Sequence, residues 1–259
     1  MKRVVQKGIA GLGNRFQVLG YCVDIAIANN AKLLVDWRDY CWNDNFSDYF
    51  TSDVIDDFKD GTYPDVKPTW WSDKINSTCP RKLTGANFAP VPTKIINSDW
   101  KTLVVCQYSA VYSDTIFKNI DFKRRLYDKL RDLEFFSAGY ECWHIRATDK
   151  TAGDPFAILK QIIAFPTPNY KVIITDNLDI KNEAHKHGIF CQSLIPPVPK
   201  SHGIHHSTDD SLRACGITRR ILNDSVLVDL LIGKNAVFFH STCENSSFSQ
   251  LITRMRNFK

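Results

Sequence analysis

An arginine flanked by polar residues follows an apolar run in the middle of the chain, where residues 140–150 read YECWHIRATDK. Ligands of open α/β sheets bind at the carboxyl ends of strands, so a strand ending here would present Arg146 to a ligand. A guanidinium can bind a diphosphate through two parallel hydrogen bonds, and Asp149 is placed to orient it. A surface turn with a local ion pair between these two residues is the alternative interpretation.

A glycine-rich segment near the N-terminus is a second candidate for anion binding. Residues 8–15 read GIAGLGNR and stand between an expected strand and an expected helix. Glycines let the backbone approach a ligand, and a helix N-terminus offers unpaired N–H groups to an anion. The spacing is not Gly-x-Gly-x-x-Gly, so the dinucleotide-binding fingerprint is absent. A purely structural tight turn remains the alternative.

A hydroxyl-rich turn near the C-terminus is the third candidate. Residues 237–249 read VFFHSTCENSSFS, which predicts a buried strand, a turn and the start of a helix. Hydroxyl and amide groups at such a turn can cradle a phosphate. Ser246 or Asn245 would serve equally as an ordinary helix cap, and Asp154, which precedes Pro155, would do so at another helix.

Several other chemistries lack their motifs in this chain. The sequence contains no Gly-x-Ser-x-Gly, no Gly-x-x-x-x-Gly-Lys-Ser/Thr and no Cys-x-x-Cys. No Asp-x-Asp is present to hold a divalent metal, so we expect arginine and lysine to neutralise any bound phosphate. His202, His205 and His206 are close in sequence, but no acid or cysteine cluster completes a metal site there.

Composition limits the classes of partner. The 259 residues are 44% hydrophobic with a net charge of +5, which is typical of a globular protein with a mild basic bias. Lysine and arginine do not cluster with aromatic residues, so nucleic-acid binding is not expected. No apolar run is long enough to span a membrane, and the N-terminus lacks the apolar region of a secretory signal. We therefore expect a cytoplasmic protein without an integral membrane segment.

Apolar runs alternate with amphipathic stretches, which is typical of an α/β fold with parallel strands. We expect strands at 4–6, 32–36, 101–106, 140–146, 171–175 and 235–241, and helices at 15–29, 122–135, 155–164, 224–232 and 246–256. Residues 37–100 and 196–216 interrupt this pattern. The first segment predicts long ordered loops with short helical turns, the usual kind of segment for substrate specificity, and the second is a further irregular segment. The pattern divides into two halves, residues 1–138 and 139–259.

Three blocks of the sequence together resemble one enzyme superfamily. Residues 11–15 (GLGNR) and 31–38 (AKLLVDWR) are similar to the start of the bacterial nodulation fucosyltransferases. The segment HIRATDK resembles the His-x-Arg-Arg-x-Asp motif of the α1,2-, α1,6- and protein O-fucosyltransferases. It is most similar to the form of this motif in the α1,6-fucosyltransferases. The expected helix with Asp229 and the Ser-Ser-Phe-Ser turn resemble the last motif of the same superfamily.

The resemblance implies a GT-B-like glycosyltransferase with two Rossmann-like parallel-sheet halves. Residues 1–138 would form the acceptor side, and residues 139–259 would bind the nucleotide sugar. The implied enzyme transfers L-fucose from GDP-fucose to an oligosaccharide or glycoconjugate, inverts the anomeric carbon, and uses neither a metal nor another cofactor. A different donor such as UDP-xylose, or a non-catalytic module that binds a nucleotide or a sugar, remains open.

The resemblance also implies roles for individual residues. Arg146 would hold the β-phosphate and stabilise the leaving group, and Asp154 would be the catalytic base that deprotonates the acceptor, unless it only caps a helix. Asp176 and Asp229 would face the nucleoside, and one of them would read the guanine edge. The donor-binding set that it implies is Gly13, Asn14, Arg15, His144, Arg146, Asp149, Asp176, Asp229, Ser246, Ser247 and Ser249.

Overall fold

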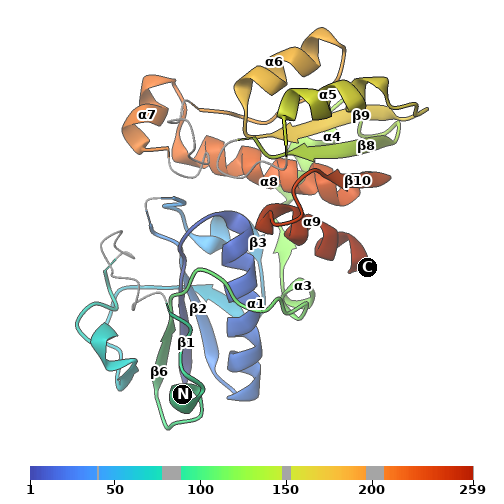
Figure 1. Ribbon diagram of the computed structural model, residues 1–259. Coiled ribbons are helices and arrows are strands. Elements are labelled where there is room, and N and C mark those ends of the chain that lie inside the picture. Colours follow the sequence, from blue (N-terminus) through green and yellow to red (C-terminus); the bar gives the residue numbers. More distant parts are fainter. Residues whose placement is uncertain (40, 78–88, 148–152, 197–206, 259) are drawn as a thin grey trace. The chain divides into compact units, whose positions relative to one another are not determined.

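The computed structural model describes all residues except 40, 78–88, 148–152, 197–206 and 259. The chain forms two compact units, Met1–Lys123 and Arg124–Lys259, each with its own parallel sheet (Figure 1). The boundary lies before the charged helix α4 (Arg124–Arg131) and not after residue 138. Helix α4 belongs to the second unit because Arg125 and Lys129 both bind Asp224 on helix α8 (Arg219–Asn235).

The first unit is built on a five-stranded sheet in the order β4-β2-β1-β6-β5, in which every neighbouring pair is parallel. The strands are β1 (Arg3–Lys7), β2 (Lys32–Asp36), β4 (Ile55–Asp57), β5 (Val66–Lys67) and β6 (Thr102–Val105). Helix α1 (Leu12–Ala28) connects β1 to β2. Val5, Leu34 and Val104 are register neighbours on the three central strands, so their side chains share one face of the sheet.

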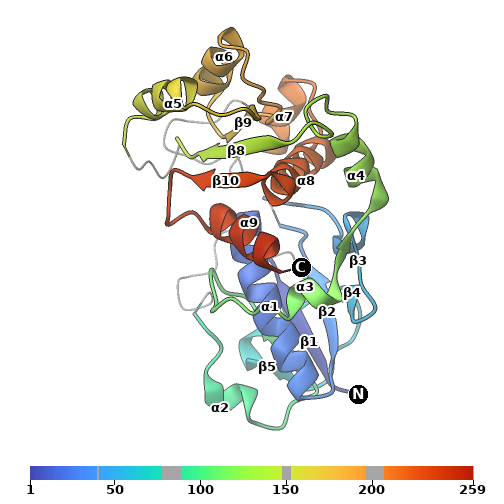
Figure 2. The ribbon, with the colours of Figure 1, turned by 90° about the vertical axis from the view of Figure 1, so that its right-hand side faces the viewer.

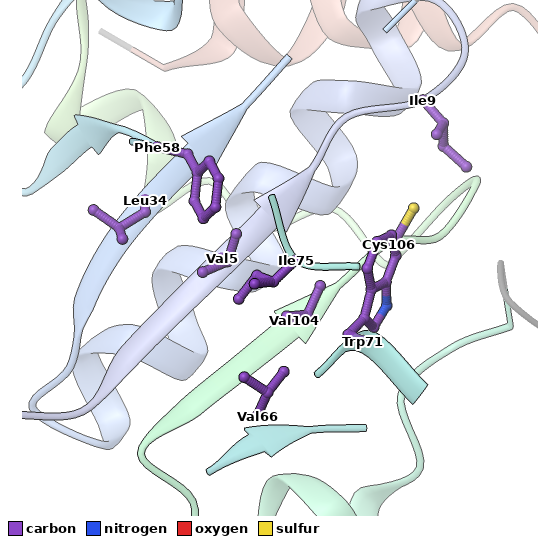
Figure 3. Packing of buried hydrophobic residues seen from close by; sticks show 9 residues of the cluster. All are labelled: Val5, Ile9, Leu34, Phe58, Val66, Trp71, Ile75, Val104 and Cys106. Carbon is purple, nitrogen blue, oxygen red and sulfur yellow. The ribbon is translucent and has the colours of Figure 1, made fainter. Parts of the chain in front are cut away.

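A cluster of buried apolar residues covers that face (Figure 3). Phe58, Trp71 and Ile75 contribute to the cluster from the segment 37–100, which was expected to be ordered loops with short helical turns. The segment also supplies the short strands β4 and β5, the strand β3 (Phe50–Thr51), the helix α2 (Thr93–Ile96) and the 3-10 turns η1 (Phe46–Asp48) and η2 (Thr69–Trp71). Strand β3 pairs with β7 (Asp121–Phe122), and α3 (Ile116–Asn119) precedes β7. The segment is therefore an ordered part of the core, and its strands are too short to show a period of two.

The second unit has a parallel three-stranded sheet in the order β10-β8-β9, formed by β8 (Tyr140–Ile145), β9 (Tyr170–Thr175) and β10 (Phe238–Ser241). Helices α5 (Pro155–Ala164) and α6 (Leu178–Lys186) cover one face with apolar residues that pack on Trp143, Ile145 and Ile173 (Figure 2). On the other face, Tyr140 donates its hydroxyl to the carbonyl of Ile232 on α8 at 2.8 Å. The central strand β8 is thus buried on both faces, as in other parallel sheets, whereas no residue of the edge strand β10 is buried, although a buried strand was predicted there.

The main predicted elements are confirmed, with differences at helix ends. Helix α7 (Asp209–Ala214) lies in a segment that was expected to be irregular, and α8 begins at Arg219, before the predicted start at residue 224. The hydroxyl of Thr218 accepts a hydrogen bond from the Ile221 amide at 3.2 Å and so fixes the start of α8. Helix α9 (Ser247–Asn257) ends the second unit. In the part of the chain that the structure describes, no helix has the length and apolar character needed to cross a membrane.

Candidate functional site

The candidate site of the second unit lies at the carboxyl ends of its three parallel strands. Arg146 directly follows β8, and Asp176 directly follows β9. After β10, the amide and the hydroxyl of Thr242 both donate to the carbonyl of His144, at 3.1 and 2.9 Å. These bonds fix the turn after β10 against the end of β8, so the Arg146 segment and the hydroxyl-rich turn, the first and third candidates from the sequence, lie at adjacent strand ends.

Arg146 is held by a carboxylate from the neighbouring strand. Its Nε lies 3.0 Å from Oδ2 of Asp176, and Oδ1 of Asp176 accepts a hydrogen bond from the Ala147 amide at 2.9 Å. Asp176 is buried, and the Arg146 side chain keeps 16% of its surface exposed. Asp176 therefore braces Arg146, which is the role expected of Asp149. Asp149 lies outside the described residues, and both oxygens of Asp176 hold the 146–147 segment.

His144 connects β8 to the first turn of α9. Its Nδ1 lies 2.6 Å from Oγ of Ser249, and its ring makes an edge contact with Phe248 at 5.4 Å between centroids. Burial, together with the nearby charge of Arg146, lowers the pKa of His144 to about 3. The imidazole is therefore neutral at physiological pH, and it positions α9 without adding a positive charge.

The start of α9 supplies a helix N-terminus at this edge. Oγ of buried Ser246 accepts a hydrogen bond from the Ser249 amide at 3.4 Å. Of the two caps that the sequence allowed, Ser246 and Asn245, Ser246 is therefore the one that caps α9. Ser247 is partly exposed, whereas the hydroxyl of Ser249 is buried against His144. A helix N-terminus carries a partial positive charge and attracts anions, which suits a phosphate here.

Asp229 lies on α8 and is buried, with 6% of its surface exposed. Nε2 of Gln192 donates to its Oδ1 at 3.1 Å. Burial raises the pKa of Asp229 to about 7, although hydrogen bonds from Ser193 and Gln192 act in the opposite direction. Oγ of Ser193 also accepts from the amide of Thr175 at 3.2 Å, which joins this network to the end of β9.

Gln192 and Ser193 were not among the predicted site residues. They follow Phe190, whose parallel bridge to Val172 extends the sheet beyond β9. A polar pair directly after the apolar run Ile189-Phe190-Cys191 is the signal that could have indicated them, because it repeats the pattern of a strand end.

Asp154 caps helix α5. Its Oδ1 accepts a hydrogen bond from the Phe156 amide at 3.0 Å, and its side chain is exposed. The capping role that was considered for this residue is therefore present in the structure. An exposed carboxylate at a helix N-terminus can also accept a proton from a bound hydroxyl.

In the first unit, the first turn of α1, directly after the glycine-rich turn, contains the other three predicted donor-binding residues. Asn14 donates from Nδ2 to the carbonyl of Tyr108 at 2.8 Å, and the carbonyl of Gly13 accepts from the Tyr112 hydroxyl at 3.4 Å. Arg15 is completely buried and pairs with Asp39 through Nη2 at 2.6 Å. Its guanidinium points into the unit, which differs from the donor contact expected of it.

The described residues contain no group of three or more His, Cys, Asp or Glu side chains arranged to hold a metal ion. His202, His205 and His206 lie outside the described residues.

No protein-family model and no curated protein matches the sequence, so similarity to known proteins rests on structure. Fucosyltransferase NodZ from Bradyrhizobium superposes with a TM-score of 0.66 at 17% identity, over 98% of this chain and 93% of that one. NodZ α-1,6-fucosyltransferase soaked with GDP-fucose gives 0.64 at 18% identity, with coverages of 98% and 93%. POFUT1 in complex with GDP gives 0.53 at 14% identity, with coverages of 99% and 94%. The chain has the GT-B-like α/β fold of these fucosyltransferases.

Proposed function

We propose that this protein is an inverting, metal-independent glycosyltransferase that moves L-fucose from GDP-fucose to a hydroxyl group of a glycan. The observation that carries the proposal is Arg146, held by Asp176 beside the turn that opens α9, at the carboxyl edge of a parallel sheet. The shared fold supports it, because one solved structure of that fold was soaked with GDP-fucose.

Arg146 and the N-terminus of α9 would bind the diphosphate. Asp176 fixes the guanidinium before a ligand arrives, so little reorganisation is needed when negative charge grows on the leaving phosphate. The N-terminus of α9, which Ser246 caps, carries a partial positive charge that would also stabilise the negative charge on the leaving phosphate. Ser247 lies in the first turn of α9 and would add a hydroxyl contact.

Asp229 would select the base of the nucleotide. A carboxylate can accept hydrogen bonds from two neighbouring N–H groups, and the Watson–Crick edge of guanine presents such a pair whereas uracil does not. Burial strengthens the discrimination, because an unpaired polar group is costly in a buried site. Gln192 and Ser193 hold the Asp229 side chain in place.

The transfer would be a single displacement. The acceptor oxygen attacks the anomeric carbon from the face opposite the diphosphate, the bond from that carbon to the phosphate oxygen breaks, and GDP leaves. Asp154 would take the proton of the acceptor hydroxyl. Its exposed position at the start of α5 leaves its carboxylate accessible to an acceptor.

The proposal is tested by following release of the nucleoside diphosphate from GDP-fucose and UDP-xylose, with and without oligosaccharide acceptors. We expect release from GDP-fucose only, faster in the presence of a suitable acceptor, and fucosylated product with inverted configuration. Release of the diphosphate from UDP-xylose alone would show that xylose, and not fucose, is the transferred sugar. Tight binding of both nucleotide sugars without any release of diphosphate would instead indicate a non-catalytic binding module.

A further inference from the structure

The glycine-rich turn of the first unit contains an alanine in an unfavourable backbone conformation. Ala10 has φ of +62°, in the left-handed region that residues with a Cβ rarely adopt. The turn is anchored on the N-terminal side of this residue. The Gly8 amide donates to the Asp36 carbonyl at 2.8 Å, and Ile9 is buried in the apolar cluster of the first unit (Figure 3).

A buried arginine side chain holds Ala10 in this conformation. Nε of Arg15 donates to the carbonyl of Ala10 at 2.9 Å, and Nη2 of Arg15 lies 2.7 and 2.6 Å from the two oxygens of Asp39. Oδ1 of Asp39 also accepts from the amide of Trp42 at 3.0 Å. The guanidinium therefore joins the turn to a fixed point elsewhere in the first unit.

The surroundings of Arg15 are shaped for its guanidinium. The carbon of the guanidinium lies 5.5 Å from the ring centre of Trp37. A Cβ at Gly8 would overlap with Nη1 of Arg15 and with the ring of Trp37, so the glycine at this position admits the arginine side chain. Among the described residues, the buried Nη1 has no hydrogen-bond partner. An apolar side chain at this position would avoid the cost of that unpaired donor. We therefore expect that arginine contributes the hydrogen bond that fixes Ala10 rather than added stability.

We propose that Arg15 and Asp39 are positioning residues that hold the turn at residues 8–11, with Ala10 in its left-handed conformation. The turn then fixes the position of Asn14 and of the first amides of α1, the groups of the first unit that would contact a nucleotide sugar. The role in donor binding rests on the proposed function, whereas the control of the turn by Arg15 does not.

The test combines a variant that removes the constraint with one that makes it unnecessary. Lysine keeps the charge beside Asp39 but lacks the Nε–H that reaches Ala10, so Arg15→Lys should let the turn relax. We expect hydrogen exchange at the turn amides to accelerate and GDP affinity in calorimetry to fall about tenfold, which is about 1.4 kcal/mol. Glycine adopts a positive φ readily, so adding Ala10→Gly to this variant should restore most of the affinity.

Asn30→Gly is the matched control, because Asn30 also has a positive φ, of 47°, but lies just beyond the other end of α1. It should relieve backbone strain without restoring GDP affinity in the Arg15→Lys background. If Arg15→Lys does not fold, Ala10→Val serves instead, because a β-branched residue disfavours the left-handed region while Arg15 and Asp39 stay in place. It should reproduce the faster exchange and the loss of affinity.

Two results would overturn the inference. One is a hydrogen-exchange rate at the turn amides that does not change in Arg15→Lys or Ala10→Val. The other is that Ala10→Gly and Asn30→Gly restore the GDP affinity of the Arg15→Lys variant to the same extent. If the wild-type protein binds no GDP, the proposed function fails. The control of the turn by Arg15 is then still decided by the exchange rates.

Discussion

Arg146 is held in one orientation by a carboxylate, which suits the diphosphate contact proposed for it. Asp176 binds its Nε and also the amide of the next residue, Ala147, so the guanidinium and its backbone are fixed together. A lysine at this position could keep the charge but could not keep this contact and a two-bond phosphate contact at once. The identity of the residue therefore matters more than its charge.

We predict that Arg146→Lys is nearly as damaging as Arg146→Ala. The loss of transition-state stabilisation should be about 2–3 kcal/mol, which corresponds to a fall in kcat of about 30- to 150-fold. Steady-state rates of GDP release measure it. Arg213→Lys is the control, because Arg213 forms an exposed ion pair on α7 and should keep the wild-type rate. A wild-type rate in Arg146→Lys would contradict the diphosphate contact.

Two buried groups of the second unit should give stability opposite dependences on pH. His144 has a pKa of about 3 in the folded protein, against about 6.5 in the unfolded chain. Its burial therefore makes the folded protein less stable as pH falls below about 6.5. Asp229 has a pKa of about 7 in the folded protein, against about 3.9 in the unfolded chain. Its burial therefore makes the folded protein less stable as pH rises from about 4 to 7. Each slope approaches about 1.4 kcal/mol per pH unit.

The variants His144→Asn and Asp229→Asn separate the two effects in urea unfolding between pH 4.5 and pH 7.5. Relative to the wild type, His144→Asn should gain stability as pH falls, and Asp229→Asn should lose it. Parallel curves for both variants and the wild type would contradict the assigned burial of these two side chains.

At the scale of elements, strand ends in the first unit are joined by buried charges. Nζ of Lys7, at the end of β1, lies 2.6 Å from Oδ2 of Asp36, at the end of β2, and 2.7 Å from the carbonyl of Ser77. Burial raises the pKa of Asp36, but hydrogen bonds from Arg38 and the charge of Lys7 outweigh this effect and the pKa is lowered. The ammonium of Lys7, paired with this carboxylate, therefore holds Ser77 of the segment 37–100 against the sheet.

Lys7→Met should destabilise the first unit by about 3–5 kcal/mol at pH 7, because it leaves part of a buried charge uncompensated. The difference from the wild type should shrink below about pH 4, where Asp36 becomes protonated and its stabilisation is lost in both proteins. Lys32→Met is the matched control, since the ion pair of Lys32 with Asp56 is exposed and should contribute less than about 1 kcal/mol. Urea unfolding that gives equal losses for the two variants would be inconsistent with this picture.

The elements that the sequence predicts well are those with long apolar runs. Strands such as β8 bury six consecutive residues, so their composition alone indicates a parallel sheet with two covered faces. Strands β4 and β5 have three and two residues and depend on neighbours distant in sequence, so no local pattern indicates them. The start of α8 was also misplaced, because the cap Thr218 follows a segment without apolar periodicity.

The same reasoning applies to the candidate site. The sequence places Arg146 at a strand end because the apolar run stops there. The partner of Arg146 could not be identified in this way, because Asp176 is adjacent only through the pairing of β8 with β9. Arg15 was expected at the donor because it follows a glycine-rich turn, but its side chain folds back to Asp39, which lies on another segment.

At the scale of the whole molecule, the account requires positive charge from the protein to replace a metal ion at the diphosphate. We predict that excess EDTA leaves the rate of fucose transfer within about twofold of the untreated enzyme, since no step is assigned to a Lewis acid. A loss of activity on chelation that Mn²⁺ or Mg²⁺ restores would contradict metal independence.

Calorimetric titration of GDP and UDP decides whether the second unit recognises a guanine nucleotide, as proposed. The titration is made at pH 8, above the pKa of about 7 for Asp229, with the wild type and Asp229→Asn. We predict that the wild type binds GDP at least about tenfold more tightly than UDP, which is about 1.4 kcal/mol, and that Asp229→Asn loses this preference without a fall in its Tm. Tighter binding of UDP by the wild type would contradict the account, and the donor would then be a UDP-sugar.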